Sequence, residues 1–444
     1  MNIRKSSLAG LLLAGIISMF CSCSPTTGSA GPDNIILLSG NATGIKCQMP
    51  VSIGDVATDI GTKSIRFSEA LAPGRITDMQ VYEDYSFLQD DMGRIFCIED
   101  DSIVNVLCLS ADGADSTRIL SCTYSPSRKT LYVTKENEAA ILCYSVPSFR
   151  QTGTLDITGY DKKITCIDDD LLIFEGYKNS YKFTSVAGSP VIPPSYQSYD
   201  LYRYRLDTGA MDSINANSMI CYSMFSTRCI SRDNNGTYIS LPGFISRAIQ
   251  YNAETLEDAY LVQFGDNRMG RLHGFPDDKR NIFYNDLAYM IGDTTIAEHY
   301  IPIGCNLFHC DNDRKSFWIG DNRESAQLGK KDTLSSRYLY AICNEDNLCM
   351  EYTVFIPVKE NGTFNLKDFH DIVPLCMHDG YTYCVFQGNR QELSALLNVP
   401  YPCDPDYELA PTAAVILDLA PEDRSSLIVL RAKFGTRIKS KDIR

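Results

Sequence analysis

Short runs of β-branched and aromatic residues alternate with clusters of Asp, Asn, Gly and Ser along the chain. Arg94–Ile98, Val104–Leu109, Thr130–Thr134 and Ala140–Val146 are examples of such runs. The runs recur about every 8–12 residues, which is the spacing of strands in β-sandwiches, barrels and propellers. We therefore predict an all-β fold.

A polar turn followed by an aromatic or β-branched strand recurs as a unit. It occurs at Asp91–Glu99, Ser125–Thr134 and Asp168–Gly176, with intervals of 36 and 41 residues between the strand centres. Four-stranded propeller blades have about this length. Six, seven or eight blades would fit in the chain, and spacing alone does not choose among them. We expect an early strand, Ile35–Leu38 or Ile65–Phe67, to close the ring by pairing with the last blade.

Helical periodicity is scarce, and its best candidate is Asn389–Asn398. Asn389 is suited to the N-cap, Glu392 stands three residues on as in a capping box, and three leucines share one face. Pro400 stops the pattern. One short helix argues against an α/β fold.

The N-terminus carries an export signal. Arg4 and Lys5 precede Leu8–Phe20, an uncharged apolar run that is shorter than the roughly 20 residues of a membrane span. Ser22-Cys23 then fits a bacterial lipobox. We predict a signal peptide over residues 1–22, lipid attachment at Cys23 and a tether over residues 23–34. The alternative is an ordinary secretory signal without a lipid.

Residues 35–444 are expected to form a single β-propeller domain. The full chain has a formal net charge of −14. Phosphate binding needs clustered Lys and Arg, so this charge argues against a nucleic-acid partner. We predict a monomer that contacts the membrane only through its lipid.

The chain contains 17 cysteines, and most of them stand inside apolar runs. Cysteine in such a run behaves as a small buried hydrophobic residue. The nearest pairs are Cys305/Cys310 and Cys343/Cys349, so we expect mostly free core thiols with one or two bridges.

Three stretches of the second half resemble segments of a known family. They are FYNDLAYMIGDTTIAEHYIPIG (Phe283–Gly304), SRYLYAICNEDNLCMEYTVF (Ser336–Phe355) and EDRSSLIVLRAKF (Glu422–Phe434). In this order, behind a lipoprotein signal, they resemble the six-bladed TolB-like β-propeller lipoproteins of Bacteroidetes, over roughly residues 70–435. A Gly-rich turn that many such proteins carry after the first blade is replaced here by SADGADSTR (Ser110–Arg118). The resemblance implies six blades and a location in the bacterial cell envelope, on the outer membrane, facing the periplasm or the surface. It supplies no catalytic residues.

Four acidic clusters are the first candidates for chemistry: Asp90-Asp91, Glu99-Asp100-Asp101, Asp168-Asp169-Asp170 and Asp277-Asp278. A glycosidase needs two opposed carboxylates, whereas adjacent Asp residues at strand ends are typical of turns. We interpret the clusters as turns.

Two segments offer possible metal ligands: CNLFHC (Cys305–Cys310) and Asp311-Asn312-Asp313. The first has no second ligand pair nearby, and the second lacks the Gly and the acidic twelfth residue of a calcium loop. We predict no metal and no cofactor.

Tyrosines crowd the segment around the Pro-rich stretch Ser189–Asp200. Aromatic rings with a polar tip suit sugar and peptide surfaces. We predict ligand binding by Tyr177, Tyr196, Tyr199 and Tyr202. The alternative is that these rings pack between blades.

The favoured function is a non-catalytic, envelope-tethered binding or scaffold protein for a glycan, a peptide or a partner protein. One alternative is a polysaccharide- or peptide-processing hydrolase or lyase with carboxylates in the propeller channel. Another is a component of an outer-membrane protein assembly.

Overall fold

The structure is a computed structural model of the chain. It describes residues 35–38, 51–68, 71–109, 119–136, 138–157, 162–177, 198–214, 230–233, 236–241, 246–251, 256–264, 304–311, 314–320, 338–343, 348–352, 354–359, 369–371, 373–404 and 407–435. The predicted signal peptide and tether, Tyr196 and Asp277-Asp278 lie outside the described residues.

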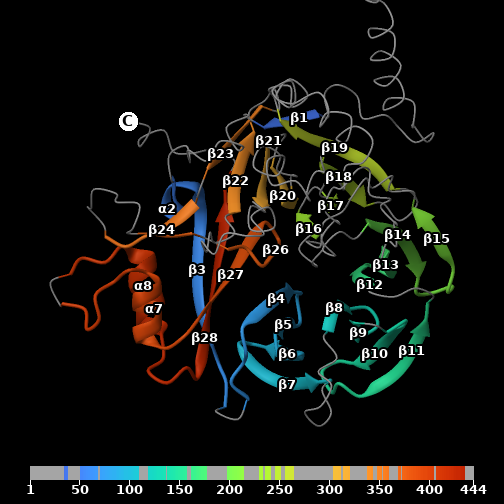
Figure 1. The fold of residues 1–444 in the computed structure, drawn as a ribbon, viewed down its shortest axis with the longest axis horizontal. Coiled ribbons are helices and arrows are strands. Elements are labelled where there is room, and N and C mark those ends of the chain that lie inside the picture. The colour runs from blue at the N-terminus through green and yellow to red at the C-terminus, as the bar shows by residue number, and fades with distance from the viewer. Residues whose placement is uncertain are drawn as a thin grey trace, which may run out of the picture.

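The described strands form six four-stranded antiparallel units that follow one another as the blades of a β-propeller (Figure 1). Blade 1 contains β4 (Ile76–Val81), β5 (Ser86–Asp90), β6 (Arg94–Glu99) and β7 (Ser102–Cys108). Blade 2 contains β8 (Ile119–Ser125), β9 (Thr130–Lys135), β10 (Ala140–Ser145) and β11 (Gln151–Asp156). Blade 3 contains β12 (Lys162–Ile167), β13 (Asp170–Tyr177), β14 (Ser198–Arg205) and β15 (Met211–Ile214).

The second half of the ring repeats this arrangement. Blade 4 contains β16 (Ile230–Asp233), β17 (Gly236–Leu241), β18 (Ser246–Tyr251) and β19 (Leu256–Phe264). Blade 5 contains β20 (Gly304–Asp311), β21 (Arg314–Gly320), β22 (Tyr338–Cys343) and β23 (Leu348–Tyr352). Blade 6 contains β26 (Cys376–His378), β27 (Tyr381–Gln387), β28 (Ser426–Phe434) and, from the N-terminal part of the chain, β3 (Ala57–Arg66). β1 (Ile35–Leu38) joins the units of blades 4 and 5 into one sheet, and a parallel contact of β3 with β7 joins those of blades 6 and 1. The all-β, six-bladed prediction is confirmed.

An early strand closes the ring, as expected. β3 is antiparallel to β28 over its whole length, with Ile65 opposite Leu427. The other candidate, β1 (Ile35–Leu38), does not join the last blade. It lies parallel to both β19 and β23 and joins the outer edges of blades 4 and 5 (Figure 1). Every residue of β1 is apolar, so its two faces do not differ in polarity. Its sequence therefore does not indicate whether it pairs with the last blade or with blades 4 and 5.

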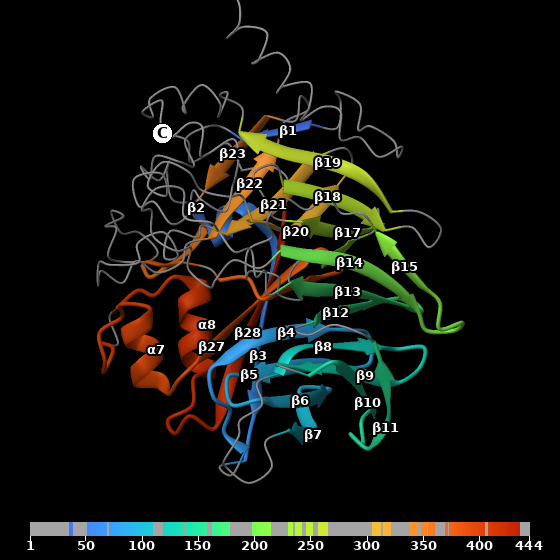
Figure 2. The same ribbon diagram turned by 45° about the vertical axis from the view of Figure 1, so that its right-hand side comes forward.

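A helical segment is inserted between β27 and β28 (Figure 2). It contains α7 (Arg390–Leu396) and α8 (Pro411–Leu419), and it packs beside a small sheet of β2 (Val51–Ser52), β24 (Val354–Pro357) and β25 (Phe369–Asp371), with the single turn α2 (Ile53–Val56). α7 is the predicted helix. Its capping box is present, because Asn389 Oδ1 accepts from the backbone N of Glu392 at 2.9 Å and Glu392 Oε2 accepts from the backbone N of Asn389 at 2.9 Å.

Side chains from one blade hydrogen-bond the backbone or a side chain of the next, and this joins neighbouring blades. Ser121 Oγ of β8 donates to Ile164 O of β12 at 3.0 Å, and Thr123 Oγ1 accepts from Cys166 N at 2.7 Å. Between blades 5 and 6 the indole N–H of Trp318 donates to Thr382 Oγ1 at 3.2 Å. These bonds fix the register between neighbouring sheets, which apolar packing alone would leave free to slide.

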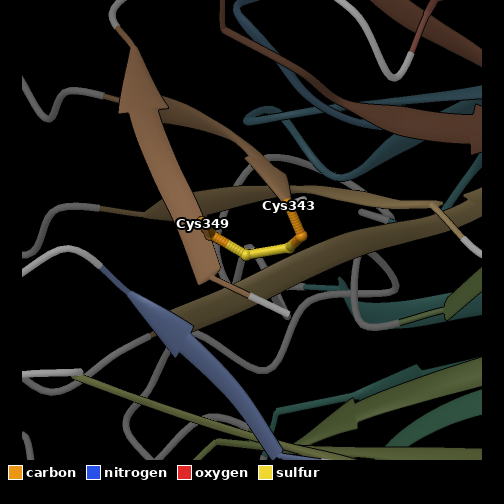
Figure 3. The surroundings of a disulfide bond; sticks show 2 residues. All are labelled: Cys343 and Cys349. Carbon is orange, nitrogen blue, oxygen red and sulfur yellow. A yellow bond between two sulfur atoms is a disulfide. The ribbon is translucent and has the colours of Figure 1, made fainter. Parts of the chain in front are cut away.

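The described cysteines follow the prediction of core thiols with few bridges. Cys343 and Cys349 form a disulfide and stand opposite each other on β22 and β23 (Figure 3). Cys97, Cys122 and Cys143 are buried free thiols, and Cys166, Cys376 and Cys384 are buried as well. The exceptions are Cys108, which is exposed on β7, and the half-buried Cys403.

Candidate functional site

The turns that follow the first strands of blades 1, 2 and 3 meet at one end of the ring. First strands line a propeller channel and run in the same direction, so these turns share an end. Tyr124 Oη of β8 donates to Asp84 Oδ2 in the β4–β5 turn at 2.8 Å. Ser127 Oγ in the β8–β9 turn donates to Asp169 Oδ1 in the β12–β13 turn at 2.7 Å. We call residues 82–85, 126–129 and 168–169 the first-turn end.

An aromatic cluster lies at this end, across the boundary between blades 1 and 2. The rings of Tyr82 and Tyr124 meet edge to face at 5.1 Å between centroids, and those of Tyr85 and Tyr124 do so at 6.0 Å. Phe87 packs beneath them, 5.2 Å from Tyr124. Tyr124 and Phe87 are buried, whereas Tyr82 and Tyr85 are half-buried. The cluster therefore presents two tyrosine rings on a rigid base.

Hydrogen bonds determine which of these tyrosines is available. Tyr82 Oη donates to Gln80 Oε1 at 2.7 Å and accepts from the backbone N of Tyr124 at 3.1 Å. Its hydroxyl therefore joins blade 1 to blade 2. Tyr85 makes no bond of this kind to blade 2 among the hydrogen bonds of the described residues, and its side-chain partner is Glu99 of β6. Tyr85 is therefore the member of the cluster best placed to touch a ligand.

Carboxylates surround the cluster and shift the titration of its tyrosines. Burial, with the nearby charge of Glu99, raises the pKa of Tyr85. Burial, together with the hydrogen bond to Asp84, raises the pKa of Tyr124. Both phenols are therefore protonated at neutral pH, and the carboxylates that border Tyr85 are the exposed Glu83, Asp84 and Glu99. The cations of the first-turn end, Arg128 and Lys129, stand in the β8–β9 turn, where Arg128 lies 3.6 Å from Asp169. At the Tyr85 ring itself the bordering carboxylates favour a neutral or positively charged ligand over an anion.

The tyrosines predicted as ligand contacts are divided between surfaces. Tyr177 stands opposite Ser198, and Ile173 of the same strand stands opposite Tyr202, so Tyr177 and Tyr202 occupy positions on one face of blade 3. Tyr199 stands opposite Gly176, at a position on the other face. The half-buried ring of Tyr202 packs against the apolar core between blades 2 and 3. Ligand binding by this set stays a prediction.

A second tyrosine–carboxylate contact joins blades 3 and 4. Tyr251 Oη donates to Asp170 Oδ2 at 2.7 Å, and the guanidinium of the buried Arg203 lies 3.9 Å from the same oxygen and 3.2 Å from Asp212. Burial and the bond to Asp170 raise the pKa of Tyr251. Because these groups contact one another across the boundary between blades 3 and 4, we assign them to the architecture of the ring.

The acidic clusters within the described residues lie at hairpin turns. Asp90 accepts from the backbone N atoms of Met92 and Arg94 and pairs with the Arg94 guanidinium at 2.7 Å. Asp100, Asp101 and Asp168 have positive φ angles of 47°, 64° and 53°. Asp and Asn tolerate this left-handed conformation better than most residues. The interpretation of these clusters as turns is confirmed for the three that the structure describes.

The tyrosine cluster was missed in the sequence analysis. Its local signal is Tyr82-Glu83-Asp84-Tyr85, two aromatics flanking two carboxylates at the end of a strand. Tyr124 lies about 40 residues further on, and only the pairing of successive blades brings it to the same place.

In the part of the chain that the structure describes, no three His, Cys, Asp or Glu side chains converge as a metal site. None of the described helices has the length and apolarity to cross a bilayer.

Comparisons with known proteins give distant structural neighbours. No family model and no curated protein matches the sequence. An exported protein of Bacteroides fragilis aligns at 10% identity with a TM-score of 0.48, over 87% of this chain and 98% of its own. BamB of Moraxella catarrhalis aligns at 7% identity with a TM-score of 0.37, over 84% and 98%. The WD40 repeats of RRP9 align at 7% identity with a TM-score of 0.36, over 87% and 100%.

Proposed function

We propose that this chain is a non-catalytic binding or scaffold protein of the bacterial cell envelope, with its ligand surface at the first-turn end of blades 1 and 2. The observation that carries the proposal is the half-buried ring of Tyr85, set on a buried aromatic base and bordered by carboxylates. Aromatic rings give contact area at low entropic cost, and carboxylates accept hydrogen bonds from hydroxyl and ammonium groups. The ligand class is a neutral or amino glycan, or a Lys- or Arg-rich peptide segment of a partner protein.

The predicted lipoprotein signal supports a location at a membrane. We propose that residues 1–22 are removed, that Cys23 carries the lipid and that residues 23–34 tether a single propeller domain of residues 35–444, in the manner of the TolB-like lipoproteins. The outer membrane is the proposed location and a monomer the proposed state. The tyrosines of the blade 3 insertion, Tyr177, Tyr196, Tyr199 and Tyr202, are further proposed ligand contacts; Tyr177 and Tyr199 stand at positions on different faces of the blade, and Tyr202 could contribute only the exposed part of its ring.

The test is a thermal-shift screen of the full-length mature protein in detergent. The probes are neutral, amino and acidic oligosaccharides, with Lys/Arg-rich and Asp/Glu-rich peptides. We expect upward shifts of the melting temperature with neutral or cationic probes. An affinity for acidic probes alone, or cleavage of any probe, would contradict the proposal.

The site is then assigned with variants. Tyr85→Ala is expected to weaken binding of the best probe by at least about 10-fold, because truncation of an aromatic residue that anchors a ligand typically costs about 2 kcal/mol or more. Tyr401→Ala is the matched control, since Tyr401 is 46% exposed on the helical insertion, on another part of the ring. An equal loss of probe affinity in both variants would show that the binding site does not lie at the first-turn end.

A further inference from the structure

The strand that follows the predicted tether is built into the ring at one defined place. β1 is parallel to β19 of blade 4, with Ile35 opposite Leu261 and Leu38 opposite Phe264, and it also pairs with β23 of blade 5 through Leu37 and Leu38. A strand hydrogen-bonded on both sides is held firmly at that boundary. The chain therefore reaches the lipid from the boundary between blades 4 and 5.

The tyrosine cluster lies at the boundary between blades 1 and 2. In a ring of six blades these two boundaries are three blades apart, which is half the circumference. Both views show β1 at one extreme of the ring and blades 1 and 2 at the other (Figure 1, Figure 2). The attachment point and the candidate site are therefore on opposite sides of the molecule.

Chain length decides whether the far side can reach the membrane. Twelve residues, Cys23 to Asn34, precede β1. Whatever their conformation, they span at most about 42 Å. A compact chain of about 410 residues has a radius of gyration of roughly 22 Å and hence a diameter of about 55 Å. The tether is shorter than the ring is wide, so blades 1 and 2 cannot turn to face the bilayer.

We propose that β1 and the lipid tether hold the propeller edge-on at a phospholipid surface, with blades 4 and 5 toward the bilayer and blades 1 and 2 toward the aqueous space. The proposal rests on the lipid anchor at Cys23. It gives the tyrosine cluster of blades 1 and 2 access to large soluble or polymeric ligands, because the membrane lies on the other side of the ring.

The test measures energy transfer from the protein to the membrane. Full-length lipidated protein is reconstituted into vesicles of phosphatidylethanolamine and phosphatidylglycerol that carry an acceptor dye on a lipid headgroup. One donor is attached to the exposed thiol of Cys108 on β7 of blade 1. The other is attached to Met211→Cys on β15 of blade 3, in a Cys108→Ser background; Met211 is 48% exposed and its blade adjoins blade 4. Peptide mapping confirms each labelled site.

We expect clearly stronger transfer from the blade 3 donor than from Cys108. Equal transfer would mean that the ring lies flat, and stronger transfer from Cys108 would mean the opposite edge faces the lipid; either result overturns the proposal. Failure of the lipidated chain to associate with vesicles also overturns it. Probe binding by the detergent-solubilised protein is measured separately, so failure of the orientation is distinguishable from failure of the proposed binding function.

A strand-breaking variant tests the role of β1 itself. Ile36→Pro removes a ladder N–H from a strand that is paired on both sides. It is expected to free the residues before β2 as additional tether and to abolish the difference between the two donors. Ile36→Val is the control and should preserve the difference. Thermal melts show that each variant is folded. A difference that persists in a folded Ile36→Pro variant would show that β1 does not set the orientation.

Discussion

Gln387 on β27 binds the backbone of Ile76 on β4, and this contact joins the last blade to the first. Gln387 Oε1 accepts from the backbone N of Ile76 at 2.8 Å, and its Nε2 donates to Gly74 O at 2.8 Å. The two residues are 311 positions apart in the sequence. The amide of one side chain thus satisfies two backbone groups of the segment that opens blade 1, beside the strand pairing of β3 with β28.

Replacing this amide should weaken ring closure. Gln387→Leu leaves the partly buried N–H and C=O of the blade 1 backbone without their partner, and we expect a loss of about 1–3 kcal/mol in the free energy of unfolding. Urea denaturation at pH 7 measures it. Gln391→Ala, on the exposed side of α7, is the matched control and should change stability by no more than about 0.5 kcal/mol. Equal losses in the two variants would show that the Gln387 bonds contribute nothing to closure.

The disulfide should stabilise blade 5 by restricting the unfolded chain. Cys343 and Cys349 are six positions apart in the sequence, so the disulfide closes a short loop. For a loop of this length the chain-entropy relation gives a stabilisation of about 2 kcal/mol in the free energy of unfolding. The double variant Cys343→Ala/Cys349→Ala should lose about this amount in urea denaturation. Cys108→Ala is the control for cysteine removal and should leave stability unchanged, because its side chain is exposed. A double variant as stable as the parent would contradict the prediction.

The helical insertion should depend on its capping box. Asn389→Ala removes the acceptor for the N–H of Glu392, and we expect a loss of about 1 kcal/mol. Asn389→Asp keeps an acceptor at the N-cap and should retain most of the stability. The readout is the urea midpoint, with hydrogen exchange of α7 as a local probe. Unchanged exchange in the alanine variant would show that packing of Leu393 and Leu397 suffices.

Alkaline conditions should destabilise the fold through its buried thiols. Burial, with Glu99 and Asp84 nearby, raises the pKa of Cys97 to about 12, and burial raises that of Cys143 to about 11, from an ordinary value of 9.0. Above pH 9 the unfolded chain releases thiol protons that the folded chain retains, so the free energy of unfolding falls as pH rises. The contribution is complete below pH 9 and is lost progressively up to about pH 11–12.

Urea denaturation at pH 7, 9 and 10.5 checks this dependence. The double variant Cys97→Ala/Cys143→Ala should show a shallower decline than the parent. Cys108→Ala should keep the slope of the parent, because that thiol is exposed in the folded chain. An identical slope in the double variant would assign the alkaline loss to other groups, such as the buried tyrosines.

Local patterns predicted the elements whose causes are local. The strand–turn spacing predicted four-stranded blades, and Asn389 with Glu392 predicted α7, because the groups that make a capping box stand three residues apart. α8 was missed: Pro411–Leu419 is apolar on nearly every side, and such a run cannot be told from a buried strand by periodicity. Ile65 was correctly expected in the closing strand, opposite Leu427.

The all-β class, the blade-length repeat and the turn role of the described acidic clusters could be predicted from short stretches of sequence, since each depends on residues within about one blade. The other features depend on contacts between blades. β1 joins blades 4 and 5, and Tyr85 meets Tyr124, only because the ring brings separate blades together. The physical reason is that a strand edge or an aromatic face accepts many partners of the same kind. Packing and hydrogen bonding of the whole ring select one partner among them. A short segment of sequence does not contain this information.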